Sequence, residues 1–247
     1  MIHANIGNGF DEWRNTARSL IARSVRPNDI IWTPETQGGL FQAESVDNAA
    51  NREVAVPSKF IKFAEAVACF EDVEKWDLLY RILFRLTHGE RNLLEIESDA
   101  DISQAKRMEK AVNRDVHKFH AFVRFRQIEC DTEEIFGAWY EPHHLTVERA
   151  TPFFVRRFGS MKFSIFTPKG CAHWDKKELT FSPAADRSMA PDGDEMEDFW
   201  LLYYRSIFNP FRLKVNAMKK EFPKRHWATL PEAVLIPDLI RAAKESG

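Results

Sequence analysis

The sequence lacks several features that would assign it to a familiar functional class. No stretch is both apolar and long enough to cross a bilayer, and the N-terminus has no basic run followed by an apolar segment. Only three cysteines are present, and none of them forms the CxxC pair that is typical of zinc and iron–sulfur sites. We therefore expect a cytoplasmic protein that has no membrane contact and needs no cofactor.

The motifs of nucleotide-using and nucleophilic enzymes are also missing. The chain contains neither a glycine-rich phosphate loop nor a GxSxG elbow. Cys69 lies in an apolar pattern with helical spacing, which indicates burial rather than reactivity. These absences make an ATP-dependent enzyme or a cysteine-nucleophile enzyme a poor expectation.

Charge is nearly balanced over the chain but strongly segregated along it. The formal net charge is −2, yet residues 105–126 hold seven Lys/Arg against two acids, and residues 205–226 hold seven against one. Residues 65–77 and 186–198 are acidic instead. Such blocks allow one face to attract phosphates while another repels them, so we expect oriented and salt-sensitive binding of a polyanion.

Hydrophobic spacing predicts a helix over residues 101–116 that carries a basic stripe on its solvated side. From His120 the period changes to two, which predicts that the chain enters a strand. In this interpretation one face of the strand carries His120, Phe122, Arg124, Arg126 and Ile128.

Further strands are expected at residues 136–141, 161–167 and 178–181. A helix between the strands at residues 136–141 and 161–167 would have Thr151 as its cap and Pro152 as its first residue. The predicted class is α+β, an antiparallel sheet of about four or more strands covered by helices. Its order is helix, two strands, helix, two strands, followed by a helical C-terminal third.

Two parts of the chain are expected to fold as separate units. Residues 1–45 predict a small helix-strand unit with a turn at Gly38 and Gly39, and residues 53–247 predict the main domain on which it packs. The polar stretch 43–52 is the expected boundary or loop.

Basic and aromatic residues suggest a surface for nucleic acid. Two arginines two apart on a strand, with Phe122 and then His120 preceding them on the same face, can bind phosphates and stack on bases; the alternative is an ordinary solvated strand with its charges paired to acids. Trp174 beside Asp175 suits an unpaired base, but Trp174 is equally well a core residue and Asp175 a turn residue. The predicted contact residues are Arg124, Arg126, Arg156, Arg157, Arg212, Lys219, Lys220 and Trp174.

Histidines and carboxylates also cluster along the sequence. Histidines occur at residues 117 and 120, at residues 143 and 144, and at residue 173, each near an acid in the sequence. This clustering suggests a general acid–base pair or a metal site. No spacing matches an established metal signature, and the alternative is that the imidazoles bind backbone or carboxylate groups. The weak catalytic candidates are His117, His120, Glu141, His143 and Asp175.

Seven segments in matching order resemble one bacterial family: RDVHKFHAFVRFR, WYEPHH, PFFVRRF, FSIFTPKGCAHWD, YYRSIFNPFRLK, MKKEFPKRHW and LPEAVLIPDLI. It is an uncharacterised DNA-metabolism domain family, found fused ahead of a uracil-DNA-glycosylase-like domain or encoded beside a putative DNA-repair radical-SAM protein. The resemblance implies a role in DNA repair or modification and assigns no catalytic residue. Because no glycosylase sequence follows, we expect the stand-alone form.

Three functions remain open at this stage. The first is a DNA-binding accessory module acting with a radical-SAM or uracil-DNA-glycosylase-like partner. The second is a metal-dependent or acid–base hydrolase or lyase acting on damaged DNA. The third is a protein-binding scaffold for the partner enzyme.

Overall fold

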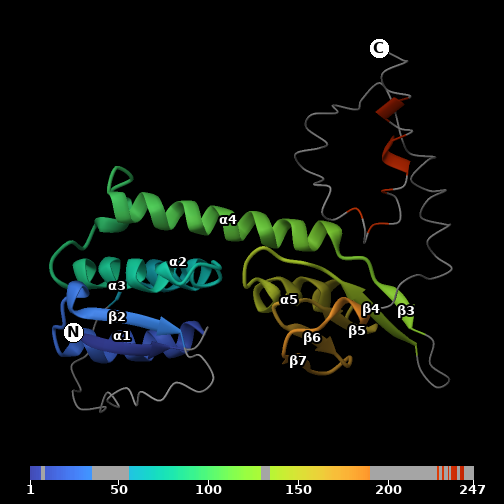
Figure 1. Cartoon of the computed structure of the whole chain (residues 1–247), viewed down its shortest axis with the longest axis horizontal. Coiled ribbons are helices and arrows are strands. Elements are labelled where there is room, and N and C mark those ends of the chain that lie inside the picture. The colour runs from blue at the N-terminus through green and yellow to red at the C-terminus, as the bar shows by residue number, and fades with distance from the viewer. Residues whose placement is uncertain are drawn as a thin grey trace. The chain divides into compact units, whose positions relative to one another are not determined.

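The computed structural model describes most of the chain, and its contacts divide it into two compact units (Figure 1). Described are residues 1–6, 9–34, 56–128 and 134–189, and near the C-terminus residues 227, 230, 233, 235–237, 240 and 241. Unit 1 comprises residues 1–115 and unit 2 residues 116–247, so the division falls within helix α4 (Ala100–Phe122). Each unit is described by itself below.

Unit 1 begins with a strand, a helix and a second strand. These are β1 (Ile2–Ile6), α1 (Phe10–Ala22) and β2 (Ile30–Pro34), with the short 3-10 helix η1 (Pro27–Asp29) before β2. The two strands are parallel, and α1 makes the crossover between them. The predicted helix and the strand near residues 29–32 are present, whereas the sequence did not reveal β1, which is only five residues long and alternates with polar side chains.

The helices of unit 1 bury an aromatic core. They are α2 (Ser58–Ala68), α3 (Glu74–Thr87) and the first part of α4, with the 3-10 helix η2 (Leu93–Glu95) between the last two. Trp13 stacks on Trp76 with ring centroids 5.9 Å apart, and its indole N–H donates to the Trp76 carbonyl at 3.2 Å. The Tyr80 hydroxyl donates to the carbonyl of Val25 at 2.9 Å. The polar atoms of these large side chains are therefore satisfied inside the core.

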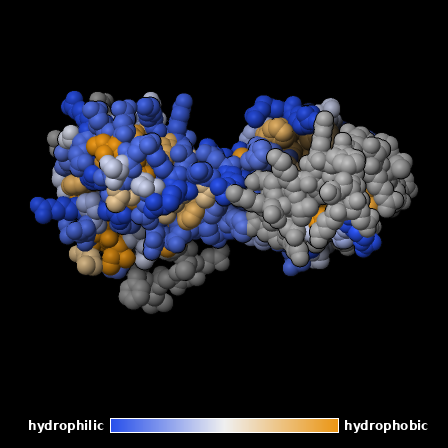
Figure 2. Space-filling model, turned by 90° about the horizontal axis from the view of Figure 1, so that it is seen from above, coloured by the Kyte–Doolittle hydropathy of each residue, from blue (hydrophilic) through white to orange (hydrophobic). Residues whose placement is uncertain are grey.

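Four large hydrophobic side chains of unit 1 are exposed among its described residues: Met1, Ile31, Val73 and Ile96. On the face that Figure 2 shows, the hydrophobic residues of unit 1 form small separate patches between hydrophilic ones.

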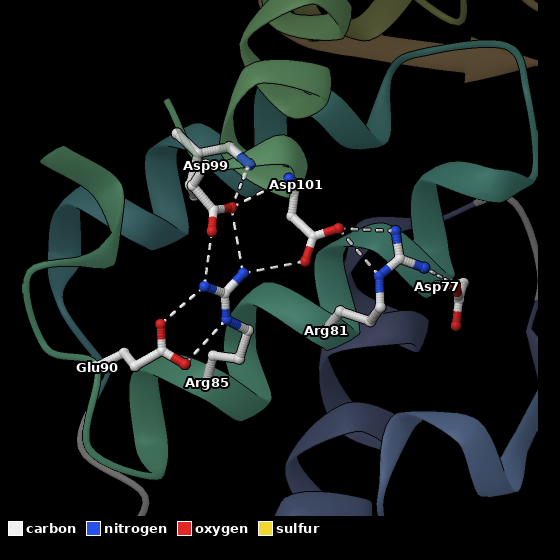
Figure 3. Close-up of polar contacts among 7 residues, drawn as sticks. Asp77, Arg81, Arg85, Glu90, Asp99 and Asp101 are labelled. Atoms are coloured by element: carbon white, nitrogen blue, oxygen red, sulfur yellow. Dashed lines mark hydrogen bonds and ion pairs between the residues drawn. The ribbon is translucent and has the colours of Figure 1, made fainter. Parts of the chain in front are cut away.

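A network of ion pairs joins the N-terminal end of α4 to α3 (Figure 3). The Arg85 guanidinium binds Asp99 through two hydrogen bonds of 2.7 and 3.1 Å and Glu90 through two more of 2.7 and 3.0 Å. Asp101 accepts hydrogen bonds from both Arg85 and Arg81. The hydrogen bonds to Arg85 hold the pKa of both Asp99 and Glu90 below their usual values.

Asp99 also caps helix α4, and its replacement by alanine gives a first prediction. Its Oδ1 accepts from the backbone N–H groups of Asp101 and Ile102 at 3.0 and 3.1 Å. We expect Asp99→Ala to lower the free energy of unfolding by about 1–2 kcal/mol, because the cap and the ion pair are lost together. Urea unfolding measures this, with Glu97→Ala, which removes one exposed pair to Lys106, as the control. Equal effects of the two variants would contradict the assignment of Asp99 as the cap.

Unit 2 is built on one five-stranded sheet. Its strands are β3 (Arg126–Ile128), β4 (Ile135–Trp139), β5 (Lys162–Phe166), β6 (Cys171–Trp174) and β7 (Leu179–Ser182), in that spatial order. Helix α5 (Val147–Arg157) joins β4 to β5, which are parallel, while the other neighbours are antiparallel. The short 3-10 helix η3 (Arg187–Met189) follows β7. The predicted α+β class is confirmed, with three strands after α5 instead of two.

One face of this sheet is covered by helices. Phe163 and Ile165 of β5 pack in one buried cluster with Phe154 of α5 and with Phe119 of α4. The neighbouring residue Ser164 points to the opposite face, because side chains alternate along a strand. The sheet therefore has a helix-covered inner face and an outer face.

Two predicted boundaries were wrong. Residues 120–122 belong to α4, Arg124 follows the helix, and Arg126 begins β3, so His120 and Phe122 do not share a strand face with the arginines. Phe119, Phe122 and Val123 are all buried, which is a helical pattern, and the alternation of Phe and Arg over a few residues imitated a strand.

The start of α5 was also misplaced. The helix begins at Val147 after Thr146, so Thr151 is not its cap and Pro152 is not its first residue. The Thr151 hydroxyl instead donates to the Val147 carbonyl one turn earlier at 2.7 Å. Pro152 lies within the helix, and the sequence rule that places proline in the first turn pointed to the wrong start.

Some predictions fall on residues outside the description. The turn at Gly38 and Gly39 and the boundary at 43–52 lie there, so the proposed division into residues 1–45 and 53–247 stays a prediction. The helical C-terminal third also lies largely outside the described residues. Within the described parts of the chain, no helix is long and apolar enough to span a membrane.

Candidate nucleic-acid interface

A histidine of α4 packs against helix α5 in unit 2. The His120 ring stacks on Phe153 with centroids 4.2 Å apart, and its Nε2 donates to the Ala150 carbonyl at 3.0 Å. Phe154 contacts the same imidazole edge-on, with centroids 5.7 Å apart. The end of α4 is thereby fixed against α5 by ring packing and by a hydrogen bond.

Helix α5 adds arginines to this surface. Arg149, Phe153 and Arg156 follow one another at spacings of four and three, which places them on one side of the helix. Arg157 lies beside them with its guanidinium 5.6 Å from the centroid of the Phe158 ring. All three arginines are exposed, and within the described residues none of them is in an ion pair with an acid.

The surroundings of His120 favour its neutral form. Burial lowers the pKa of His120 most, the hydrogen bond to the Ala150 carbonyl raises it, and the charges of His117 and Arg156 lower it. His120 is therefore neutral at neutral pH, while the arginines around it stay charged. We call the surface formed by these residues the cationic surface: His117, His120, Arg149, Phe153, Arg156 and Arg157.

The lowered pKa of His120 predicts acid sensitivity of the fold. An unfolded chain binds a proton at His120 below about 6.5, whereas the folded chain resists it, so stability is complete above that pH and falls as the pH drops toward the folded pKa. Urea unfolding at pH 7.5 and pH 5 should show a lower midpoint at pH 5, and His120→Gln should reduce the difference. An unchanged difference in that variant would assign the pH dependence to other groups.

Of the other predicted basic residues, Arg124 and Arg126 have surroundings of their own. Arg124 follows α4, and its guanidinium donates to the carbonyls of Ala121 and Val123 at 2.7 and 3.2 Å. Arg126 is only 9% exposed at the start of β3. Arg212, Lys219 and Lys220 lie outside the described residues.

Trp174 and Asp175 take the structural roles that the sequence left as alternatives. Trp174 is half-buried against the core of unit 2, and its indole N–H donates to the Gly159 carbonyl at 3.0 Å. Asp175 accepts from the backbone N–H groups of Glu178 and Lys177 at 2.7 and 2.8 Å, which lowers the pKa of its carboxyl. The pair is therefore a core residue and a turn residue rather than an open platform for a base.

The catalytic candidates have separate surroundings in unit 2. Glu141 accepts from the indole N–H of Trp139 at 2.9 Å, and the backbone carbonyl of His143 accepts from the Lys169 ammonium at 2.7 Å. His117 and His120 interact with each other as described above. No group of three or more His, Cys, Asp or Glu side chains suited to a metal ion occurs within the described part of the chain.

The outer face of the sheet carries a cluster that the sequence did not reveal. The His173 ring on β6 makes two hydrogen bonds of 2.8 Å, from Nδ1 to the Ser164 hydroxyl on β5 and from Nε2 to the Ser182 hydroxyl on β7. Burial lowers the pKa of this imidazole. The two serines have no motif around them, and only strand pairing brings them to one histidine.

These observations define an α+β protein whose second unit presents arginines and a packed histidine beside a mixed sheet. The chain belongs to the family described as a domain of unknown function, DUF4130, whose model matches residues 73–232, more than half of the chain. The match includes all of α3, α4, α5 and the five-stranded sheet. No curated protein and no solved structure matches the chain.

Proposed function

We propose that this protein is a DNA-binding accessory module in DNA repair or modification, and that the cationic surface contacts the sugar-phosphate backbone. The observation that carries the proposal is the set of exposed arginines Arg149, Arg156 and Arg157 on α5, the helix against which His120 of α4 is stacked. Three exposed arginines without acidic partners in the described chain supply charge that phosphates can neutralise. Backbone contacts of this kind give affinity without sequence preference.

The chemistry of the side chains favours phosphate over an acidic protein surface. Arginine offers a planar fork of donors that matches two phosphate oxygens, and three forks spaced along one helix suit a repeating polyanion. One face of the Phe153 ring stacks on His120, and the proposal assigns no base stacking to Phe153. The proposed mode is therefore backbone binding on duplex or single strands.

The family resemblance supports the biological setting of the proposal. The segments at residues 114–126, 139–144, 152–158 and 163–175 carry much of it, and they include the second half of α5 and strand β6. In that setting a radical-SAM or uracil-DNA-glycosylase-like partner performs the chemistry, and this chain holds the DNA. The module would then determine where the partner acts.

The test is the affinity of the purified chain for single- and double-stranded oligonucleotides of mixed sequence. We expect binding to both and an affinity that falls steeply between about 50 and 200 mM salt, because cations are released from the phosphates. Fluorescence anisotropy measures the affinity at each salt concentration. Absent binding, or binding that is insensitive to salt, would contradict the proposal.

Two further outcomes distinguish the other functions. Product formation from lesion-bearing oligonucleotides, with or without a divalent metal, would identify a hydrolase or lyase. Co-purification with the radical-SAM partner in the absence of any DNA affinity would identify a protein-binding scaffold.

A further inference from the structure

The hydrogen bonds around His173 form a chain across three strands of unit 2. Ser164 and His173 are directly opposite each other on β5 and β6, and Ser182 on β7 is opposite Cys171, two residues from His173 on the same face. Both hydroxyl oxygens lie 2.8 Å from a ring nitrogen. Neighbouring Phe166 contacts the imidazole edge-on, with centroids 6.0 Å apart, and restricts its rotation.

The two hydrogen bonds of the His173 ring cannot have the same direction. A neutral imidazole has one N–H donor and one bare nitrogen that accepts, so one serine hydroxyl must donate to the ring while the other accepts from it. The hydroxyl that donates lies next to a base able to take its proton. The hydroxyl that accepts holds the ring in one tautomer and orientation.

Exposure indicates which serine is the reactive one. Ser182 is exposed, whereas Ser164 is half-buried between neighbouring strands. Only an accessible oxygen can meet an incoming electrophile. A nucleophilic Ser182 requires the tautomer with the N–H on Nδ1, facing Ser164, and the accepting nitrogen at Nε2, facing Ser182. The order of nucleophile, base and orienting group is that of an activated hydroxyl.

We propose that Ser182 is an activated nucleophile that accepts acyl groups from carboxylic esters, with His173 as its general base and Ser164 as a positioning residue. This activity lies on the outer face of the sheet and goes beyond DNA binding, on which it does not depend.

The reaction balances with the ester and water as the only co-reactants. The Ser182 oxygen forms a bond to the ester carbonyl carbon while its proton passes to Nε2 of His173. The bond from that carbon to the alcohol oxygen then breaks, and the leaving alcohol takes the proton from the imidazolium. Water repeats the two steps in place of the serine, which releases the carboxylic acid and restores Ser182.

The test uses a fluorophosphonate probe, which joins its phosphorus to a nucleophilic serine oxygen and releases fluoride. The full chain is incubated with the probe, and labelled serines are located by peptide mass spectrometry. We expect Ser182 to be labelled about 100-fold faster than Ser160, an exposed serine of the same unit, because general-base assistance has effects of about that size. This comparison is internal to one molecule and needs no variant to fold.

Variants then test the role of each residue. His173→Gln should slow labelling of Ser182 to the rate of Ser160, Ser164→Ala should slow it partly, and Ser164→Thr should preserve it because the hydroxyl remains. Circular dichroism establishes that each variant is folded. Equal labelling of Ser182 and Ser160 in the unaltered chain, or unchanged labelling in folded His173→Gln, would overturn the proposal. Neither result bears on DNA affinity, so the two proposals fail separately.

Discussion

Alanine in place of Arg149, Arg156 and Arg157 together is expected to weaken DNA binding more than any other surface change in the described chain. All three side chains are exposed on α5, the helix against which the half-buried His120 packs. Because each arginine is expected to neutralise about one phosphate, the triple variant should lose more than about tenfold in affinity at moderate salt. Anisotropy with a mixed-sequence duplex measures the loss.

A charge-matched variant separates local contact from net charge. Arg18, Arg23 and Arg26 of unit 1 are also exposed, and their replacement by alanine removes the same three charges. This control should bind DNA nearly as well as the unaltered chain. Similar losses in both triple variants would show that only overall charge matters, which would contradict a defined interface on α5.

Phe154→Ala is expected to have the largest effect on stability in unit 2. Phe154 is 2% exposed, and its ring contacts Phe119, His120 and Phe125 at centroid distances of 6.0, 5.7 and 5.6 Å. Removal of this ring leaves a cavity where α4, α5 and the sheet meet, so the free energy of unfolding should fall by about 3–5 kcal/mol. Thermal or urea unfolding followed by near-ultraviolet circular dichroism measures it.

Phe181→Ala is the matched control for that prediction. Phe181 is 44% exposed on β7, so the same chemical change there creates no cavity. We expect a shift of less than about 1 kcal/mol. A cost at Phe181 as large as that at Phe154 would mean that the outer end of the sheet is packed in a way that this account does not describe.

The sequence predicted the class of the fold better than its boundaries. Helical spacing and alternation located α4, β4, α5 and β5 approximately, because each buries one set of side chains against a core, and β7 was located although its residues are mostly exposed. The end of α4 could not be predicted, since the hydrophobic pattern of residues 119–126 fits both a helix and a strand. Packing against the core of the folded unit decides which of the two forms. Strands β1 and β6 are short and contain polar residues at alternate positions, which leaves a weak hydrophobic signal.

The candidate sites were predictable only in part. The adjacent pair Arg156 and Arg157 could be picked out, because neighbouring cations are visible in a sequence. Phe153 as the support of His120 was not visible, since it depends on how α4 meets α5. The hydrogen bonds of His173 depend on strand register, and register is set by turns and core packing far from the residues concerned.

The arginines of α3 and those of α5 differ in their ion pairs. In the described chain, Arg81 and Arg85 of unit 1 are held by acids that fix α3 to α4. Arg149, Arg156 and Arg157 of unit 2 have no such acids in the described residues. Paired arginines stabilise the fold, whereas the exposed ones remain available for an external polyanion.

The dependence of DNA affinity on salt tests the cationic surface most directly. When the logarithm of the association constant is plotted against the logarithm of salt concentration, the slope counts the phosphates that the protein neutralises. We predict that the slope of the Arg149/Arg156/Arg157 alanine variant is less steep than that of the unaltered chain by about 3, and that the Arg18/Arg23/Arg26 variant keeps the original slope. Identical slopes for all three proteins would contradict the claim that this surface holds DNA.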